Sequence, residues 1–172
     1  MKRYLALVVT ILFSLVLLCS CSKTGDSNVY QYLGDYSYSA PAVCMVYEAV
    51  EGEFDDAGNP YYGIQYREVK DLNGLLTSGN TIMIYFYSSM SSEAAAVTAA
   101  MEDLAQSYQG RVTVVMLDAI VYRELIEKYN IEAVPEFVLI KAGQEDKVFN
   151  SSASEYWTVS DVVLWLQSNG VA

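Results

Sequence analysis

Short apolar runs alternate with longer amphipathic segments through the second half of the chain. The runs are rich in aromatic and β-branched residues, which favour strands, whereas the amphipathic segments repeat their apolar residues every three to four positions, which favours helices. The predicted strands are 81–87, 112–117, 137–140 and 147–149. The predicted helices are 70–77, 91–108, 122–129 and a last helix that Thr158 opens, with Asp161 as its capping-box partner. With a strand before Val69 as the first element, this order predicts an α/β domain with helices packed on a sheet.

The part of the chain before Val69 has a different pattern. Residues 55–60 read Asp-Asp-Ala-Gly-Asn-Pro, a cluster of turn-forming residues, and strand-like residues flank it on both sides. This predicts a β-hairpin over 45–68, whose acidic turn lacks the ligand spacing of a calcium-binding loop and is expected to be solvated. Further upstream, tyrosines at 30, 32, 36 and 38 are spaced by two within each pair, which predicts extended segments with one aromatic face. That face is either a contact surface or, as we favour, packs on the domain.

The first residues have the features of an exported, lipid-anchored chain. Lys2 and Arg3 precede a run of about fourteen mostly apolar residues, which matches the core of a signal peptide and is short for a membrane span. The run ends in Leu-Cys-Ser-Cys, which resembles the lipobox of bacterial lipoproteins. The resemblance implies cleavage before Cys21, a diacylglycerol on its sulfur, and a position on the extracytoplasmic face of a bacterial cell membrane. The alternative is an uncleaved N-terminal anchor.

These patterns divide the chain into four regions. They are a signal peptide (1–20), a tether with a tyrosine-rich extension (21–44), the hairpin (45–68) and a C-terminal α/β domain (69–172). The start of the tether is polar and contains Gly25, so it predicts a short flexible connection between the lipid and the folded part.

Charge and composition exclude several classes of function. The formal net charge is −11, and without Lys2 and Arg3 the remaining 8 basic and 21 acidic residues leave −13. Such a chain is not expected to bind nucleic acid, which requires clustered Lys and Arg. The chain has no histidine, the commonest general base and transition-metal ligand, so neither a metal site nor a cofactor is predicted.

The three cysteines have different expected fates. Cys19 leaves with the signal peptide and Cys21 carries the lipid, so Cys44 is the one free thiol of the mature chain. A single thiol forms no internal disulfide and cannot perform dithiol–disulfide exchange. Cys44 lies within a predicted strand, where a small buried hydrophobic residue is the favoured interpretation over a reactive thiol.

Two segments of the α/β domain carry a resemblance to a known family. In IYFYSSMSSEAAA (84–96), an apolar strand runs through a small polar turn into an alanine-rich helix, and in YNIEAVPEFVLIKAGQ (129–144), Pro135 precedes a strand and a glycine turn. With the order of the elements, these segments resemble the thioredoxin-like superfamily over about residues 65–172. The resemblance implies a three-layer α/β fold that carries the hairpin as an N-terminal extension. It also implies that Pro135 occupies the family's cis-proline loop, which exposes the backbone of Val134 to an extended client.

The residues that perform the family's redox chemistry are different here. The resemblance places Ser91 and Ala94 at the two cysteine positions of the family's Cys-x-x-Cys turn. The other departures are Met90 for tryptophan, Tyr85 for the buried acid, Met116 for its lysine and Glu136 for threonine. A hydroxyl and a methyl group form no disulfide, so the sequence predicts loss of dithiol chemistry and no enzymatic activity. Ser91 has no histidine beside it to act as a base, so we interpret it as a helix N-cap.

Three functions compete at this stage. The favoured one is a membrane-tethered, redox-inactive thioredoxin-like protein that binds a protein or peptide partner in a groove. The groove residues would be Met90, Ser91, Ser92, Val134 and Pro135. The second is a thiol–disulfide oxidoreductase that uses Cys44 or a partner protein. The third is a structural accessory lipoprotein that acts through its tyrosine-rich extension or the hairpin.

Overall fold

The structure is a computed structural model and describes residues 29–91, 94–154 and 156–171. The signal peptide, Cys21 with the start of the tether, and Ser92 lie outside the described residues. The described elements are η1 (Val29–Tyr32), β1 (Leu33–Tyr36), β2 (Ala42–Phe54), β3 (Pro60–Val69), α2 (Leu72–Leu76), β4 (Ile82–Tyr87), α3 (Ala94–Ser107), β5 (Thr113–Asp118), α4 (Arg123–Lys128), β6 (Glu136–Ile140), β7 (Lys147–Val148), η2 (Ser151–Ala153) and α5 (Val159–Ser168). None of these helices has the length and apolar character needed to cross a membrane.

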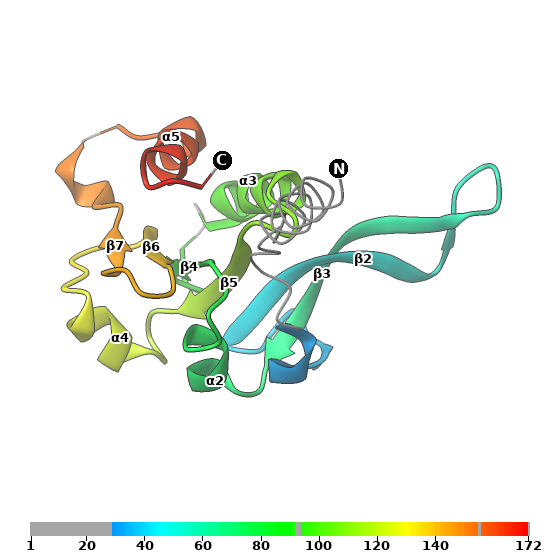
Figure 1. The fold of residues 1–172 in the computed structure, drawn as a ribbon, viewed down its shortest axis with the longest axis horizontal. Helices are drawn as coiled ribbons and strands as arrows, with labels where there is room; N and C mark the ends of the chain where they lie inside the picture. Colours follow the sequence, from blue (N-terminus) through cyan, green and yellow to red (C-terminus); the bar gives the residue numbers. More distant parts are fainter. Residues whose placement is uncertain (1–28, 92–93, 155, 172) are drawn as a thin grey trace, which may run out of the picture.

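One mixed sheet forms the centre of the fold (Figure 1). Its seven described strands lie in the order β1-β3-β2-β5-β4-β6-β7. β4 and β5 are parallel and are connected through α3, whereas the other neighbouring strands are antiparallel. Apolar residues of α3 and α5 pack on one face of the sheet, and those of α2 and α4 pack on the other. This arrangement confirms the predicted α/β class, with helices on both sides of a central sheet.

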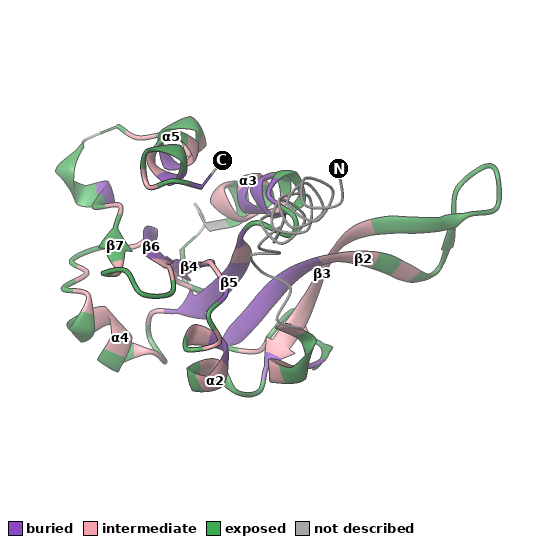
Figure 2. Cartoon of the chain, in the orientation of Figure 1, coloured by how far each residue is buried: buried purple, intermediate pink, exposed green. Residues whose placement is uncertain are grey.

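The central strand β4 shows how the sequence builds the two cores. Met83 and Tyr85 belong to the core on the α3 and α5 side, whereas Ile82, Ile84 and Phe86 belong to the core on the α2 and α4 side. All five side chains are fully buried, and the burial is greatest along the middle of the sheet (Figure 2). Because both faces of this strand are covered, it appears in the sequence as a continuous apolar run and not as an alternating pattern.

β2 and β3 form a hairpin whose base belongs to the central sheet. Residues 42–45 of β2 pair antiparallel with β5, which places β2 between β3 and β5. Sequence analysis put the hairpin outside the α/β domain, whereas Val43 and Met45 are buried in the core beneath α3. The strand that leads into α2 is therefore not a direct neighbour of β5. Beyond its base, the hairpin extends away from the helices (Figure 1).

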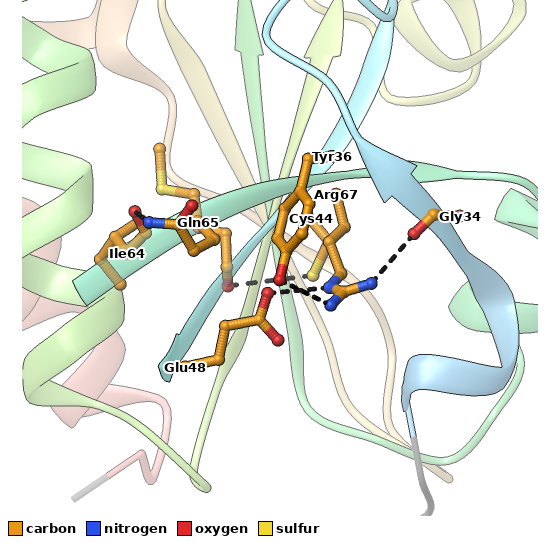
Figure 3. A network of polar contacts seen from close by, with 8 residues as sticks. Gly34, Tyr36, Cys44, Glu48, Ile64, Gln65 and Arg67 are labelled. Atoms are coloured by element: carbon orange, nitrogen blue, oxygen red, sulfur yellow. Dashed lines mark hydrogen bonds and ion pairs between the residues drawn. The ribbon is translucent and has the colours of Figure 1, made fainter. Parts of the chain in front are cut away.

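Arg67 fastens the tyrosine-rich extension to the sheet (Figure 3). Its Nε donates to Glu48 Oε1 at 2.9 Å, and its two Nη atoms donate to the Tyr36 hydroxyl at 3.0 Å and the Gly34 carbonyl at 3.3 Å. The guanidinium carbon also lies 4.4 Å from the ring centroid of Tyr36 and 5.7 Å from that of Tyr30. The extension therefore packs on the domain, with part of each of these two rings still exposed.

Replacing Arg67 with alanine is expected to release the extension from the sheet. The change removes three hydrogen bonds and two cation–π contacts, and it leaves the half-buried Glu48 carboxylate without its ion pair. We expect a loss of about 2 kcal/mol in the free energy of unfolding, together with faster chymotrypsin cleavage after Tyr30 and Tyr36. Arg123→Ala is the matched control, because Arg123 is exposed and donates to the nearby Ile120 carbonyl. Cleavage at the same rate in both variants would contradict the assignment.

Candidate functional site

The turn between β4 and α3 carries part of the predicted site at the carboxyl end of the central strand. The Ser91 N–H donates to the Ser88 carbonyl at 3.1 Å, and the Met90 N–H donates to the Ser88 hydroxyl at 3.3 Å. These bonds close the turn and leave Met90 with 84% of its surface exposed. Ser91 is also exposed. α3 is described from Ala94 onward, so the capping of this helix by Ser91 stays a prediction.

The proline loop before β6 lies against this turn. The Val134–Pro135 peptide bond is cis. A small depression of about 10 Å³ is lined by Tyr85, Tyr87, Ser88, Ser91, Val134 and Pro135. The structure thus brings together three of the predicted groove residues, Ser91, Val134 and Pro135. Met90 projects from the same turn without lining the depression.

Tyr85, which lines this depression, belongs to a stacked pair of aromatic rings. Tyr85 is fully buried and stacks on Phe137, with ring centroids 5.5 Å apart and planes 20° from parallel. Its hydroxyl is hydrogen-bonded to Thr98 of α3. Burial raises the pKa of the Tyr85 hydroxyl, so this group is neutral at physiological pH. A neutral, packed ring therefore stands at the position where the resemblance places the family's buried acid.

Glu136, directly after the proline, is a buried acid with three donors around it. Only 4% of its surface is exposed. Its Oε1 accepts from the Phe137 N–H at 2.8 Å, and its Oε2 accepts from the Ser151 N–H at 2.8 Å and from the Ser151 hydroxyl at 3.3 Å. The same hydroxyl lies 2.8 Å from the Pro135 carbonyl. The carboxylate and Ser151 together tie the proline loop to η2.

Sequence analysis identified Glu136 as a departure from the family and did not identify Ser151. The two residues are 15 positions apart, and no local pattern links them. The one hint of this contact in the sequence is that Glu136 stands between a proline and an apolar strand. An acid at such a position is expected to be buried, and a buried carboxylate requires hydrogen-bond donors nearby.

A comparison with known families agrees with this geometry. The family model named Thioredoxin matches residues 67–161, which is more than half of the chain. The chain belongs to the thioredoxin family. The predicted α/β thioredoxin-like fold class is thereby confirmed.

Several solved structures are similar to this thioredoxin-family chain. Mitochondrial thioredoxin 3 from Saccharomyces cerevisiae, in its oxidised form, is 24% identical with a TM-score of 0.39, over 46% of this chain and 77% of that one. The J-Trx1 fragment of ERdj5 is 18% identical with a TM-score of 0.47, over 59% of this chain and 49% of that one. A designed protein is 21% identical with a TM-score of 0.46, over 57% of this chain and 83% of that one.

Exposed apolar side chains lie at the same end of the sheet as the depression in this thioredoxin-family domain. Ile120 and Val121, in the loop after β5, have 44% and 57% of their surface exposed. The Ala119 N–H donates to the Tyr87 carbonyl at 2.9 Å, which holds this loop beside the end of β4. The loop and Met90 thus place exposed apolar side chains at the same end of the sheet, and such surfaces often mark binding sites.

The backbone of Val134 is available at the centre of this end of the sheet. Val134 is half-buried, and among the described residues no backbone hydrogen bond involves its N–H or its carbonyl. A backbone donor and acceptor of this kind can pair with an extended peptide, as an open strand edge does.

Cys44, the thiol of the alternative oxidoreductase hypothesis, lies in β2 and has no exposed surface. Burial raises the pKa of its thiol to about 12, and the negative charge of Glu48 contributes in the same direction. Because the thiolate is the reactive form, these surroundings favour a structural role for Cys44.

We expect iodoacetamide to leave Cys44 unmodified in the folded protein at about pH 8. With a pKa of about 12, roughly one thiol in ten thousand is ionised at that pH, because the ionised fraction falls about tenfold for each unit by which the pH lies below the pKa. Intact mass measurements would follow the reaction in native buffer and in urea, where alkylation should go to completion. Ser91→Cys in a Cys44→Ala background is the exposed control and should react readily. Rapid modification of Cys44 in the folded protein would instead revive the oxidoreductase hypothesis.

A larger cavity, of about 950 Å³, lies at the opposite end of the sheet and includes Thr81 and Thr113 in its lining. The two basic side chains in its lining both donate hydrogen bonds to backbone carbonyls at the C-terminal ends of helices. Lys141 Nζ donates to the Asn169 carbonyl at 2.8 Å, and Arg111 donates to the Ser107 carbonyl. These cations stabilise the carboxyl ends of α5 and α3, so we assign no ligand to this cavity. Across the described residues, no cluster of three or more acidic, Cys or His side chains is placed to hold a metal ion.

Proposed function

We propose that this protein is a membrane-tethered member of the thioredoxin family that binds an extended segment of a protein partner and performs no dithiol redox chemistry. The observation that carries the proposal is the position of Ser91. It is exposed at the turn where the family has its first cysteine, and it shares a depression with Val134 and Pro135. The turn thus places an exposed hydroxyl beside the proline loop and carries no thiol.

The absence of thiol chemistry is argued from the residues of the turn and from Cys44. A serine hydroxyl is protonated at neutral pH and cannot form the mixed disulfide through which exchange proceeds. Ala94 offers no second thiol. The remaining thiol, Cys44, is buried in β2. We therefore do not assign an enzymatic activity to this protein.

Partner binding is supported by two features of the same surface. The Val134 backbone can accept and donate main-chain hydrogen bonds, which give affinity for an extended chain regardless of its sequence. The exposed side chains of Met90 and Val121 can contact apolar side chains of that segment. A protein or peptide segment in the cell envelope is the class of partner that uses both.

Membrane tethering rests on the lipobox-like sequence that ends at Cys21. Replacing Cys21 with serine should remove the acyl chains and release the protein from the membrane fraction, because two acyl chains are needed for stable anchoring. Cys19→Ser is the matched control and should leave the protein anchored. Fractionation of cells and mass spectrometry of the N-terminal peptide would distinguish the two. Release by both variants, or by neither, would contradict lipid attachment at Cys21.

The partner-binding proposal is tested by returning a thiol to the turn. In a Cys44→Ala background, Ser91→Cys should trap cysteine-bearing partners as mixed disulfides when cells are quenched with acid. Ser107→Cys is the matched control, because Ser107 is an exposed serine at the other end of α3. Non-reducing gels and mass spectrometry would identify each adduct.

The expected result is one or a few discrete adducts that form with Ser91→Cys and not with Ser107→Cys. Adding Met90→Asp should weaken them, since a charge would disfavour an apolar contact at the edge of the groove. The same adducts with both cysteines, or none with a Ser91→Cys protein whose new thiol reacts with iodoacetamide, would overturn the proposal.

A further inference from the structure

The outer part of the β2–β3 hairpin stands apart from the domain. We refer to residues 47–64 as the arm. Residues 51–62 of the arm are all exposed, and this outer part of the ribbon extends beyond the helices (Figures 1 and 2). A two-stranded ribbon on its own is marginally stable in water. The exposed part of the arm is therefore not expected to add to the stability of the domain, and a binding role would explain it better.

Aromatic side chains lie on both faces of the arm. On one face, Tyr47 and Tyr62 have ring centroids 6.0 Å apart. On the other, Tyr61 and Val50 both lie next to Gly63, each 3.5 Å from the place of a Cβ at that residue. Tyr61 and Tyr62 each keep 51% of their surface exposed, and Phe54 near the tip keeps 65%. Exposed aromatic rings at this density are typical of binding surfaces.

All the charged residues of the arm are acidic. Residues 47–66 contain no lysine or arginine. Its exposed acids are Glu51, Glu53, Asp55 and Asp56. Asp55 serves the turn, because its Oδ1 accepts from the N–H groups of Ala57 and Asn59 at 2.9 and 2.8 Å. The other three carboxylates have no hydrogen bond or ion pair with any described residue, so they are free to pair with an external cation.

Both strand edges of the arm are open. β2 pairs with β5 only through residues 42–45, and β3 pairs with β1 only between Tyr36 and Arg67 and between Leu33 and Val69. Beyond these positions each strand has a neighbour on one side alone. Open edges can accept another extended chain through main-chain hydrogen bonds. Charged residues on an open edge can instead serve only to prevent pairing between the edges of two molecules. Binding of a basic peptide distinguishes this role from docking.

We propose that the arm is a docking surface for a basic, extended segment of another protein. The carboxylates attract lysine or arginine side chains, the tyrosine and phenylalanine rings contact their cationic heads and alkyl chains, and the open edges supply main-chain pairing. This inference goes beyond the proposed function. β2 runs antiparallel to β5 from Ala42, opposite Leu117, to Met45, opposite Val114, so the arm leaves the sheet at the end opposite the Ser91 groove.

A second copy of the chain does not fit this surface. Two arms would repel each other, because they carry the same charge. The described residues contain seven basic side chains, and six of them already contact an acid or a carbonyl within their own domain: Arg67, Arg111, Arg123, Lys128, Lys141 and Lys147. An anionic membrane surface would repel the arm as well.

The experiment uses the full-length protein in detergent micelles and a fluorescent peptide in which lysine alternates with valine. A peptide with glutamate in place of lysine is the charge control. The basic peptide should bind, its affinity should fall as salt is raised, and hydrogen exchange of arm amides should slow on binding.

The arm variant is Glu51→Gln, Glu53→Gln and Asp56→Asn. The matched variant is Asp103→Asn, Glu124→Gln and Glu127→Gln, which neutralises three exposed acids elsewhere.

We expect the arm variant to weaken binding of the basic peptide about tenfold, and the matched variant less than about twofold. Tyr61→Ser and Tyr62→Ser together should also weaken it while leaving the thermal unfolding of the domain unchanged. Equal weakening by the two acid variants, binding of the glutamate peptide, or no binding of the basic peptide to the wild type would overturn the proposal. The Ser91→Cys experiment is independent of this one, because it reports on a different surface.

Discussion

Replacing Glu136 with alanine is expected to lower the free energy of unfolding by about 3 kcal/mol. The carboxylate accepts from the backbone N–H groups of Phe137 and Ser151, each at 2.8 Å, in a site that is 4% exposed. Alanine leaves both donors without a partner and out of reach of bulk water. Each unsatisfied buried donor costs about 1–3 kcal/mol, and domains of this size are stable by about 5–15 kcal/mol in total.

Urea denaturation of the purified protein measures this effect. Glu132→Ala is the matched control, because Glu132 is an exposed acid in the same loop, and it should change stability by less than about 0.5 kcal/mol. Glu136→Gln should fall between the two, since its amide keeps one acceptor oxygen and places an NH₂ group against the other backbone N–H. A loss in Glu136→Ala no larger than in Glu132→Ala would show that the carboxylate is not held as described.

The same variant bears on the candidate site. Ser151 donates its hydroxyl to the Pro135 carbonyl at 2.8 Å, and its own N–H is held by Glu136. Loss of the carboxylate therefore frees one side of the proline loop. In the Ser91→Cys background, Glu136→Gln should reduce the yield of mixed disulfides more than Glu132→Ala does. If the yields are equal, the loop's position does not depend on this pair.

Restoring an acid at position 85 is expected to unfold the protein. Tyr85→Asp returns the residue type that the family resemblance places there, but the ring of Tyr85 is fully buried and stacks on Phe137 at 5.5 Å. Removing a buried aromatic ring costs about 3–5 kcal/mol, and a buried carboxylate without partners adds a further penalty. The total approaches the whole stability of a small domain.

Circular dichroism and thermal unfolding test this result, with Tyr85→Phe as the conservative comparison. Phenylalanine keeps the ring stacking and loses the hydrogen bond to Thr98, so it should cost about 1 kcal/mol. A folded Tyr85→Asp protein with nearly the wild-type melting temperature would mean that the space around residue 85 can admit water. An unfolded Tyr85→Asp protein would mean that the core does not accommodate an acid at residue 85. The differences from the family's redox residues would then include the core below the turn as well as the turn itself.

Local sequence was sufficient for the features that depend on neighbouring residues. The run 81–87 predicted a buried strand because its two faces are both apolar, and β4 occupies 82–87. Asp55 to Pro60 predicted a turn, and Asp55 accepts from the backbone two and four residues ahead. Thr158 and Asp161 form the predicted capping box, with the Thr158 N–H donating to the Asp161 carboxylate at 2.7 Å. That the turn at Ser91 has no thiol is also a property of the sequence alone.

The tertiary structure decided the features that join distant segments. β2 lies between β3 and β5 because residues 42–45 pair with 114–117, and strand order is not encoded in the periodicity of either strand. Arg67 meets Glu48 across 19 residues, and Glu136 meets Ser151 across 15. An isolated arginine or glutamate in a sequence does not indicate its partner, since the free energy of the pair depends on burial and geometry that only the folded chain provides.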